Sequence, residues 1–382
     1  MKVYFDNAAS TKVSEAAIEV MIKAMREDYA NPSARHMMGV EAERYMKNAQ
    51  EIIAKTLKAE PKEIIFTSGG TESNNMALIT TAAAYSRAGK HIISTSIEHS
   101  AVYEPLGYLR EQGFEISIIP VDSSGRADTE TLKRELRADT ILVSAMFVNN
   151  EIGALEPIEE IASIVHNYNP EILFHTDAIQ AYGKYSICPK RMGIDLMSAS
   201  AHKLHGPKGV GFLYASPRVK LRPLIYGGGQ QRGLRSGTLN IPSIAGFAAA
   251  AKDAYEKLEE NTEKMLRIKD YLIENLEKEE GIRINSQRGR EGAPHILSVS
   301  VRGVRSEVLL HALEEYSIYI ASGSACSSNH PGISGTLRGI GLDQELLGST
   351  IRLSFCGENT MEEARYFVEV FDRLLPKLRK FS

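Results

Sequence analysis

The chain has 382 residues, of which 43% are hydrophobic and 24% are charged, values that are typical of soluble globular proteins and argue against a disordered or fibrous protein. Its formal net charge of -3 gives no electrostatic basis for binding nucleic acid or an anionic membrane surface, so small diffusible substrates suit it better. A chain of this length usually divides into two domains.

The sequence carries no signal for export or for a metal centre. No apolar run approaches the roughly 18 residues that a membrane-spanning helix needs, and the first residues lack the apolar core of a secretion signal, so we expect a cytoplasmic protein without membrane contact. The cysteines Cys188, Cys326 and Cys356 are too few and too scattered for a disulfide framework or a zinc site. We therefore expect free thiols and no metal.

The first 58 residues predict a short strand and two helices. Residues 3–5 lead into a polar turn, and apolar side chains recur at helical spacing over 14–28 and 39–58. Between the two helices, Asn31 precedes a proline, which predicts a turn. Asn31 is either a plain turn residue or an amide that faces a ligand, and the pattern leaves both interpretations open.

Residues 64–78 predict a strand, a glycine turn and the start of a helix. Gly70 lets the backbone approach a ligand closely, and Thr71 adds a hydroxyl where the free amides and the dipole of a helix N-terminus attract an anion. The turn is therefore a candidate phosphate site. An ordinary capped turn between a strand and a helix explains the same pattern.

Apolar strands then alternate with helical patterns, which indicates a mostly parallel sheet. The strand patterns fall at 91–95, 115–119, 141–148 and 172–176. Polar residues follow three of these strands, namely His99, Asn150, and Asp177 with Gln180. His99 can lie on a flat cofactor or carry protons, and Asn150 can bond a phenolic oxygen or a carboxylate. Each alone is more commonly a cap or a core residue, but strand ends of a parallel sheet share one edge, where such sheets build sites.

Lys203 lies among small residues, two histidines and a glycine-proline turn, 26 residues after Asp177. A partly desolvated lysine has a lowered pKa and can form a Schiff base with a carbonyl. Such a lysine, with an aspartate for the pyridinium nitrogen, is what pyridoxal phosphate (PLP) needs from its protein. The spacing alone leaves open a solvated loop lysine and an aspartate that caps a helix.

The remaining chain predicts a binding loop and a second domain. In the glycine-rich stretch 227–240, Arg232, Arg235 and Thr238 are candidate anion donors, with a flexible linker as the alternative. A long helical pattern over 243–280 then gives way to an α+β pattern. We expect a large domain of residues 14–255 and a small domain made of residues 1–13 and 256–382.

Two residues of the small domain are candidates for chemistry. Cys326 lies in a loop of small residues, 322–332, that leaves its sulfur accessible, whereas Cys188 and Cys356 are expected to be buried and inert. Arg352 lies within an apolar strand, where an arginine needs a carboxylate from the protein or from a ligand.

Taken together, these motifs resemble the NifS/IscS-type cysteine desulfurases over nearly the whole chain. The motifs that carry the resemblance are Gly-Gly-Thr-Glu-Ser, Asn-Asn-Glu-Ile-Gly, the stretch around Lys203, Gly-Gly-Gly-Gln followed by Arg-Ser-Gly-Thr, and Ser-Gly-Ser-Ala-Cys. The resemblance implies fold type I of the PLP-dependent transferases, class V: an α/β large domain with a mostly parallel central sheet and a smaller α+β domain.

The same resemblance implies an activity and its partners. PLP is the expected cofactor, L-cysteine the substrate, and L-alanine and an enzyme persulfide the products. The expected assembly is a homodimer that passes sulfur to an acceptor or scaffold protein, in iron–sulfur cluster assembly or other sulfur trafficking. The alternatives are a selenocysteine lyase or another class V aminotransferase on the same fold, and a scaffold for cluster assembly that lacks the cofactor.

By position, the resemblance assigns catalytic roles to Lys203, Cys326 and His99. Lys203 would form the Schiff base and move the α-proton, His99 would stack on the ring, and Cys326 would attack the sulfur. Asp177 would keep the pyridine nitrogen protonated, and Gln180 would meet the ring oxygen.

The resemblance also assigns binding roles. The phosphate would be held by Gly70, Thr71, Ser200 and His202, together with Thr238 from the partner subunit. Asn31 and Arg352 would take the substrate carboxylate, with Asn150 beside them and the cofactor. Three residues depart from the usual family pattern, namely Gly70, Ala201 and Gln231. Of these, Gln231 removes a charge near the phosphate loop.

Overall fold

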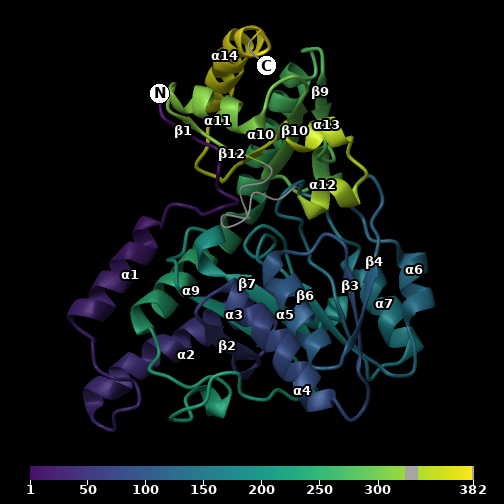
Figure 1. Cartoon of the computed structure of the whole chain (residues 1–382). Helices are drawn as coiled ribbons and strands as arrows, with labels where there is room; N and C mark the ends of the chain where they lie inside the picture. The colour runs from purple at the N-terminus through teal and green to yellow at the C-terminus, as the bar shows by residue number, and fades with distance from the viewer. Residues whose placement is uncertain (323–333, 381–382) are drawn as a thin grey trace.

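A seven-stranded sheet forms the centre of the computed structural model, which describes residues 1–322 and 334–380 (Figure 1). Its strand order is β2 (Ile64–Thr67), β8 (Gly211–Ala215), β7 (Leu196–Ser200), β6 (Leu173–Asp177), β5 (Thr140–Ser144), β3 (His91–Thr95) and β4 (Glu115–Ile119). Only β8 runs antiparallel to its neighbours among these strands. The expected mostly parallel sheet is therefore confirmed.

Helices cover both faces of this sheet, because neighbouring side chains of each strand point to opposite faces. Leu173 and Leu196 pack in one apolar cluster with α3 (Gly70–Asn75) and α5 (Ser100–Glu111), and α4 (Thr81–Tyr85) adds Ala82. The adjacent residues Phe174 and Met197 pack in the other cluster. Its helices are α2 (Met37–Leu57), α7 (Ile158–Tyr168), α8 (Pro189–Met192) and α9 (Ile241–Glu256).

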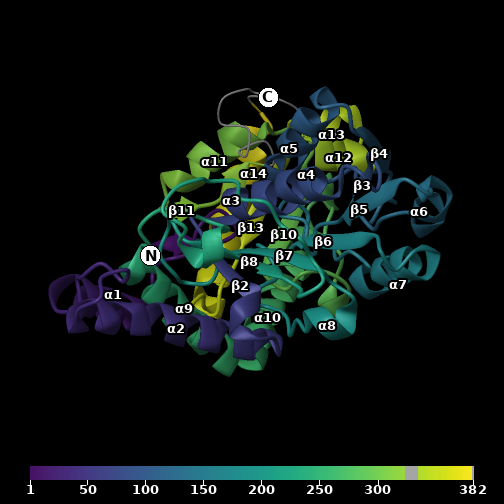
Figure 2. The same ribbon diagram turned by 90° about the horizontal axis from the view of Figure 1, so that it is seen from below.

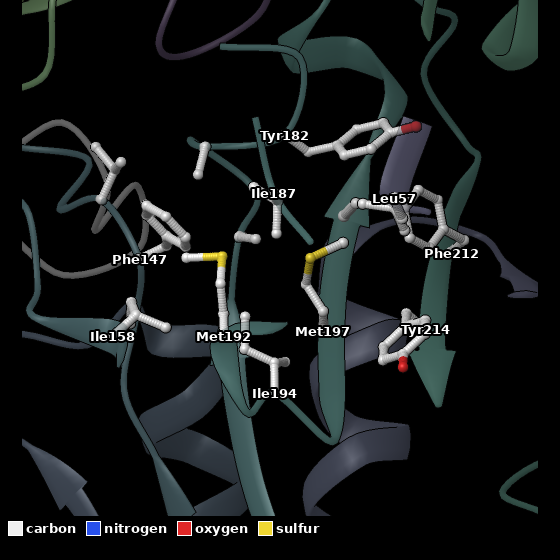
Figure 3. Close-up of a cluster of buried hydrophobic side chains, with 14 of the residues drawn as sticks. Leu57, Phe147, Ile158, Tyr182, Ile187, Met192, Ile194, Met197, Phe212 and Tyr214 are labelled. Carbon is white, nitrogen blue, oxygen red and sulfur yellow. The ribbon is translucent and has the colours of Figure 1, made fainter. Parts of the chain in front are cut away.

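This second cluster is rich in aromatic and sulfur-containing side chains (Figure 3). The Tyr182 and Phe212 rings meet edge to face with centroids 5.0 Å apart, and Leu57 of α2 lies beside Phe212. Figure 2 shows α1 (Glu15–Arg26) and α2 at one end of the sheet and α6 (Thr129–Glu135) and α7 at the other. The sheet is therefore covered along its whole width.

A second group of elements packs above this sheet in Figure 1. Its four-stranded sheet has the order β12 (Ala321–Ser322), β13 (Thr350–Ser354), β10 (Ile296–Val301) and β9 (Ile282–Ile284). The helices of this part are α10 (Leu258–Leu276), α11 (Ser306–Glu314), α12 (Gly335–Gly339), α13 (Gln344–Leu347) and α14 (Met361–Leu378). None of the helices in the described ranges combines the length and apolarity that a membrane crossing requires.

The N-terminal segment belongs to this second group of elements. Strand β1 (Val3–Tyr4) pairs in parallel with β11 (Ile318–Tyr319), and Phe5 packs on Phe355 with ring centroids 5.1 Å apart. This packing agrees with the expected assignment of residues 1–13, although the exact boundaries of the two domains stay a prediction.

Two expected elements differ in the structure. The helical pattern over 243–280 is divided at Lys257, whose backbone is non-helical, into α9 and α10. The strand expected over 316–321 is divided into β11 and β12, which belong to different sheets. Both breaks reflect tertiary packing, because no proline or glycine marks either position.

Candidate active site

A cavity of about 340 Å³ lies where the C-terminal ends of β6 and β7 meet the N-terminal segment and β13. Its walls bring together most of the predicted site residues from distant parts of the chain. The lining residues are Ala8, Ala9, Gly70, Thr71, His99, Ala101, Met146, Val148, Asn150, Asp177, Ile179, Gln180, Ser200, His202, Lys203 and Arg352.

Asp177 provides a buried carboxyl group at the end of β6, with only 4% of the residue exposed. Its Oδ2 accepts a hydrogen bond from Asn74 Nδ2 at 2.7 Å, and its Oδ1 accepts one from the Ile179 amide at 3.0 Å. Burial raises the pKa of Asp177, while these hydrogen bonds and the nearby His99 and Lys203 oppose that effect. A carboxylate held in this way favours a cationic partner inside the cavity.

His99 caps the N-terminus of α5 and lies in the cavity wall. Its Nδ1 accepts a hydrogen bond from the Ala101 amide at 3.0 Å, so in the neutral ring the proton is on Nε2. Burial lowers the pKa of His99, which favours this neutral form. The side chain therefore offers a flat, uncharged ring with one N–H donor.

Lys203 ends the short 3₁₀ turn η3 (Ala201–Lys203) that follows β7. Its Nζ donates hydrogen bonds to the main-chain oxygens of Ala8 at 2.6 Å and Ala9 at 2.9 Å. The N-terminal segment thus holds the lysine amine inside the cavity with two neutral acceptors and no carboxylate among these bonds. An amine in this environment keeps access to its neutral, nucleophilic form.

The glycine turn before α3 forms a narrow part of the wall. A Cβ atom on Gly70 would lie 2.1 Å from Ile179 Cδ1, so glycine fits beside this isoleucine where a larger residue would displace it. Thr71 follows at the start of the helix, with Ser200 and His202 across the cavity. Burial, reinforced by the charge of Lys203, lowers the pKa of His202 to about 4, so this ring is a neutral donor at neutral pH.

Arg352 is 5% exposed and confirms the expectation that this arginine pairs with a carboxylate. Its NH2 donates to Asp6 Oδ1 at 2.9 Å, and its NH1 donates to the main-chain oxygen of Asn150 at 2.8 Å. Gln180 lies nearby and donates from Nε2 to the Ala8 oxygen at 3.0 Å. Its buried Oε1 has no hydrogen-bond partner in the described part of the chain.

Three predicted site residues do not reach this cavity. Asn31 is exposed between α1 and α2, and its Oδ1 accepts the Ser33 amide at 2.9 Å, which closes a turn. Thr238 is exposed and is not part of the cavity wall. Cys326 lies outside the described residues. The roles assigned to these three residues stay predictions.

The two arginines of the glycine-rich loop already have protein partners. Arg235 donates to the Glu72 carboxylate at 2.8 and 3.1 Å, and Arg232 donates to the Lys62 oxygen at 2.6 Å. Their interpretation as anion donors is therefore wrong, because both guanidinium groups hold the loop against the protein.

The two cysteines within the described ranges also differ from each other. Cys356 is buried, and burial raises the pKa of its thiol to about 11, as expected for an inert cysteine. Cys188 is only partly buried, which corrects the expectation for that residue. The same ranges contain no group of three or more His, Cys, Asp or Glu side chains arranged to hold a metal ion.

Sequence reasoning missed several residues that shape the cavity. Asn74 lies one helical turn after Gly70, and that spacing alone placed it on the same face of the helix. No comparable signal existed for Asp6, Ala8 and Ala9, because their positions depend on strands more than 300 residues away along the chain.

The donors and acceptors of the cavity fit pyridoxal phosphate. The buried Asp177 carboxyl suits a protonated ring nitrogen, the Gly70 turn with Thr71 suits a phosphate, and the Lys203 amine suits an aldehyde. The unpartnered Gln180 Oε1 adds a buried polar atom that the protein alone leaves without a donor.

Comparison with known proteins agrees with this geometry. The family model described as "Aminotransferase class-V" matches residues 3–367. The protein named cysteine desulfurase IscS of Dictyoglomus turgidum is 41% identical over 382 residues, which cover 100% of this chain and 96% of that protein.

Two solved structures extend the similarity to the fold. One, titled "NIFS-LIKE PROTEIN", has a TM-score of 0.94 and 41% identity, with 99% of this chain and 100% of the other covered. Another, titled "SspA in complex with cysteine", has a TM-score of 0.82 and 34% identity, with 94% and 100% covered.

Proposed function

The chain belongs to the class-V aminotransferase family, and from this membership we infer that it is a PLP-dependent cysteine desulfurase. We propose that it converts L-cysteine to L-alanine and holds the released sulfur as a persulfide on Cys326. The observation that carries this function is the presence of Lys203, Asp177 and Arg352 in one cavity. These side chains supply an amine for the cofactor, a partner for its ring nitrogen and a cation for the substrate carboxylate.

PLP, when bound, supplies an electron sink that makes the substrate α-proton acidic and weakens the Cβ–S bond. In this proposal, Asp177 holds the ring nitrogen and His99 covers the ring, with Gln180 and Asn150 at its edge. The phosphate is held by Gly70, Thr71, Ser200 and His202. Lys203 takes the α-proton at Nζ, and this amine already lies in the cavity next to Asp177 and His99.

Arg352 orients the substrate through its carboxylate, with Asn150 beside it. The thiolate of Cys326 then attacks the substrate sulfur: an S–S bond forms, the Cβ–S bond breaks, and the carbon skeleton takes a proton to become the methyl group of alanine. This step depends on the thiolate fraction of Cys326 and on its reach.

We also propose that the enzyme acts as a cytoplasmic homodimer that passes sulfur to an acceptor protein for cluster assembly or other sulfur trafficking. The exposed positions of Thr238 and Asn31, outside the cavity of their own subunit, support contributions to the site of the partner subunit. Thr238 would reach the phosphate there, and Asn31 the substrate carboxylate.

The Cys326→Ser variant tests this function. It should keep the visible absorbance of bound PLP and form no alanine or sulfide from L-cysteine, whereas the wild type forms both. Continued turnover in the variant would exclude the proposed sulfur transfer. A 2-keto acid product would favour an aminotransferase, and a protein that stays colourless after PLP is added would favour a scaffold.

A further inference from the structure

Asp6 holds the guanidinium group that faces the substrate site. Arg352 is almost completely buried, and two of its edges are already occupied, by the Asn150 oxygen and by Asp6 Oδ1. Its Nε has no hydrogen-bond partner in the described part of the chain. The guanidinium therefore keeps N–H donors for a ligand while its orientation is fixed from two sides.

The backbone fixes Asp6 in this place. Asp6 forms a parallel bridge with Ser354, which lies two residues after Arg352 and so on the same face of β13. The Ser354 amide donates to the Phe5 oxygen at 2.7 Å, and Ser354 Oγ accepts the Ala8 amide at 2.9 Å. Contacts on both sides of Asp6 thus set its side chain against the arginine.

The same short segment controls both cations of the cavity. Asp6 pairs with Arg352 through its side chain, and the next turn accepts two hydrogen bonds from Lys203 through the oxygens of Ala8 and Ala9. A bound substrate carboxylate on Arg352 thus lies next to a resident carboxylate, and like charges at this distance repel each other.

We propose that Asp6 is a positioning residue of the carboxylate site: it orients Arg352 and, by its negative charge, weakens the binding of the substrate and product carboxylates. The inference rests on the proposed function. It explains how a buried arginine binds a carboxylate with the correct geometry and still releases the product. Glu151 also lies within electrostatic range of Arg352, but its Oε2 accepts a hydrogen bond from Ser334 Oγ at 2.5 Å.

Binding of L-alanine, followed through the absorbance of the bound cofactor, separates orientation from charge. Asp6→Asn keeps an acceptor oxygen for Arg352 and removes the charge, so the dissociation constant of L-alanine should fall about tenfold. Asp6→Ala removes both, so Arg352 can turn, and this variant should bind L-alanine more weakly than Asp6→Asn. Glu358→Gln, an exposed charge change beyond β13, is the control and should bind like the wild type.

Asp6→Asn binding equal to or weaker than the wild type would overturn the inference, as would equal binding by Asp6→Asn and Asp6→Ala. Thermal unfolding of each variant shows that it is folded. The wild type is assayed in parallel for alanine formation from L-cysteine. If it forms none, the proposed function fails, whereas an active wild type with an unaltered Asp6→Asn variant rejects only the role of Asp6.

Discussion

Lys184 donates a hydrogen bond from Nζ to the main-chain oxygen of Lys203 at 2.7 Å. Lys184 thereby holds the backbone of the residue whose side chain enters the active-site cavity. It also lines a separate small cavity of about 50 Å³ together with Cys356. Desolvation, followed by the positive charge of Lys203, lowers the pKa of Lys184 to about 7.

This lowered pKa predicts a specific pH dependence of stability. Between pH 7 and about 10, the unfolded state binds more protons at position 184 than the folded state does, because a free lysine has a pKa near 10.4. The free energy of unfolding of the wild type should therefore rise with pH across this range, relative to Lys184→Met, by up to about 1.4 kcal/mol per pH unit.

Urea unfolding at pH 7, 8.5 and 10 measures this difference. Lys252→Met, a change at an exposed lysine of α9, is the matched control and should keep a constant offset from the wild type. If the curves of Lys184→Met and the wild type stay parallel across the range, Lys184 does not carry this penalty.

Asn74→Ala should weaken cofactor binding. The substitution removes the donor to Asp177 Oδ2 and leaves a buried carboxyl with one hydrogen bond fewer, so its ionised form becomes less favourable. Hydrogen bonds to charged groups contribute about 1.5–3 kcal/mol, which corresponds to roughly 10- to 100-fold in the dissociation constant of PLP. Equilibrium dialysis, read by the visible absorbance of the retained cofactor, measures the loss.

Asn167→Ala on the surface of α7 removes an amide far from Asp177 and should retain PLP like the wild type. Equal retention by Asn74→Ala and the wild type would show that Asn74 does not support the aspartate.

Gln231→Glu should destabilise the protein at pH 8 and much less at pH 5. The Gln231 amide brackets Phe66 of the edge strand β2: Oε1 accepts the Phe66 amide and Nε2 donates to the Phe66 oxygen, both at 2.7 Å. A carboxylate has no donor and would face that oxygen, at a cost of about 1–3 kcal/mol. The folded state thus raises the pKa of the new glutamate, and stability returns as falling pH protonates it.

Thermal unfolding at the two pH values measures this effect. Gln231→Ala loses both hydrogen bonds without adding a charge, so its deficit should be the same at pH 5 and pH 8. A Glu variant as stable as the wild type at pH 8 would contradict the bracket. The departure from the family pattern at position 231 is therefore a structural exchange of a charge for a donor.

The central sheet and one edge of the site were predictable from the sequence. Apolar runs define the parallel strands, and the C-terminal ends of such strands meet at one edge, which is why His99, Asp177 and Lys203 line one cavity. Lys203 and Asp177 also have chemically distinctive side chains among apolar neighbours, so pattern and chemistry agreed there.

The other wall of the cavity was not predictable in this way. Asp6 and Ala8 reach it only because β1 pairs with β11 and Asp6 bridges to Ser354, and local patterns do not encode pairings over such distances. Arg235 gave the opposite error: its loop resembles an anion site, but a partner 163 residues away, Glu72, occupies the guanidinium.

The pairing of β1 with β11 has a consequence for the order of events during synthesis. Residues 3–4 leave the ribosome first, but their partners at 318–319 and the bridging Ser354 are made near the end. The wall that holds Lys203 and Arg352 cannot form before nearly the whole polypeptide has emerged. Loading of the cofactor into a finished cavity is therefore a post-translational event, and a nascent chain stalled before residue 318 would have its lysine but no wall to hold it.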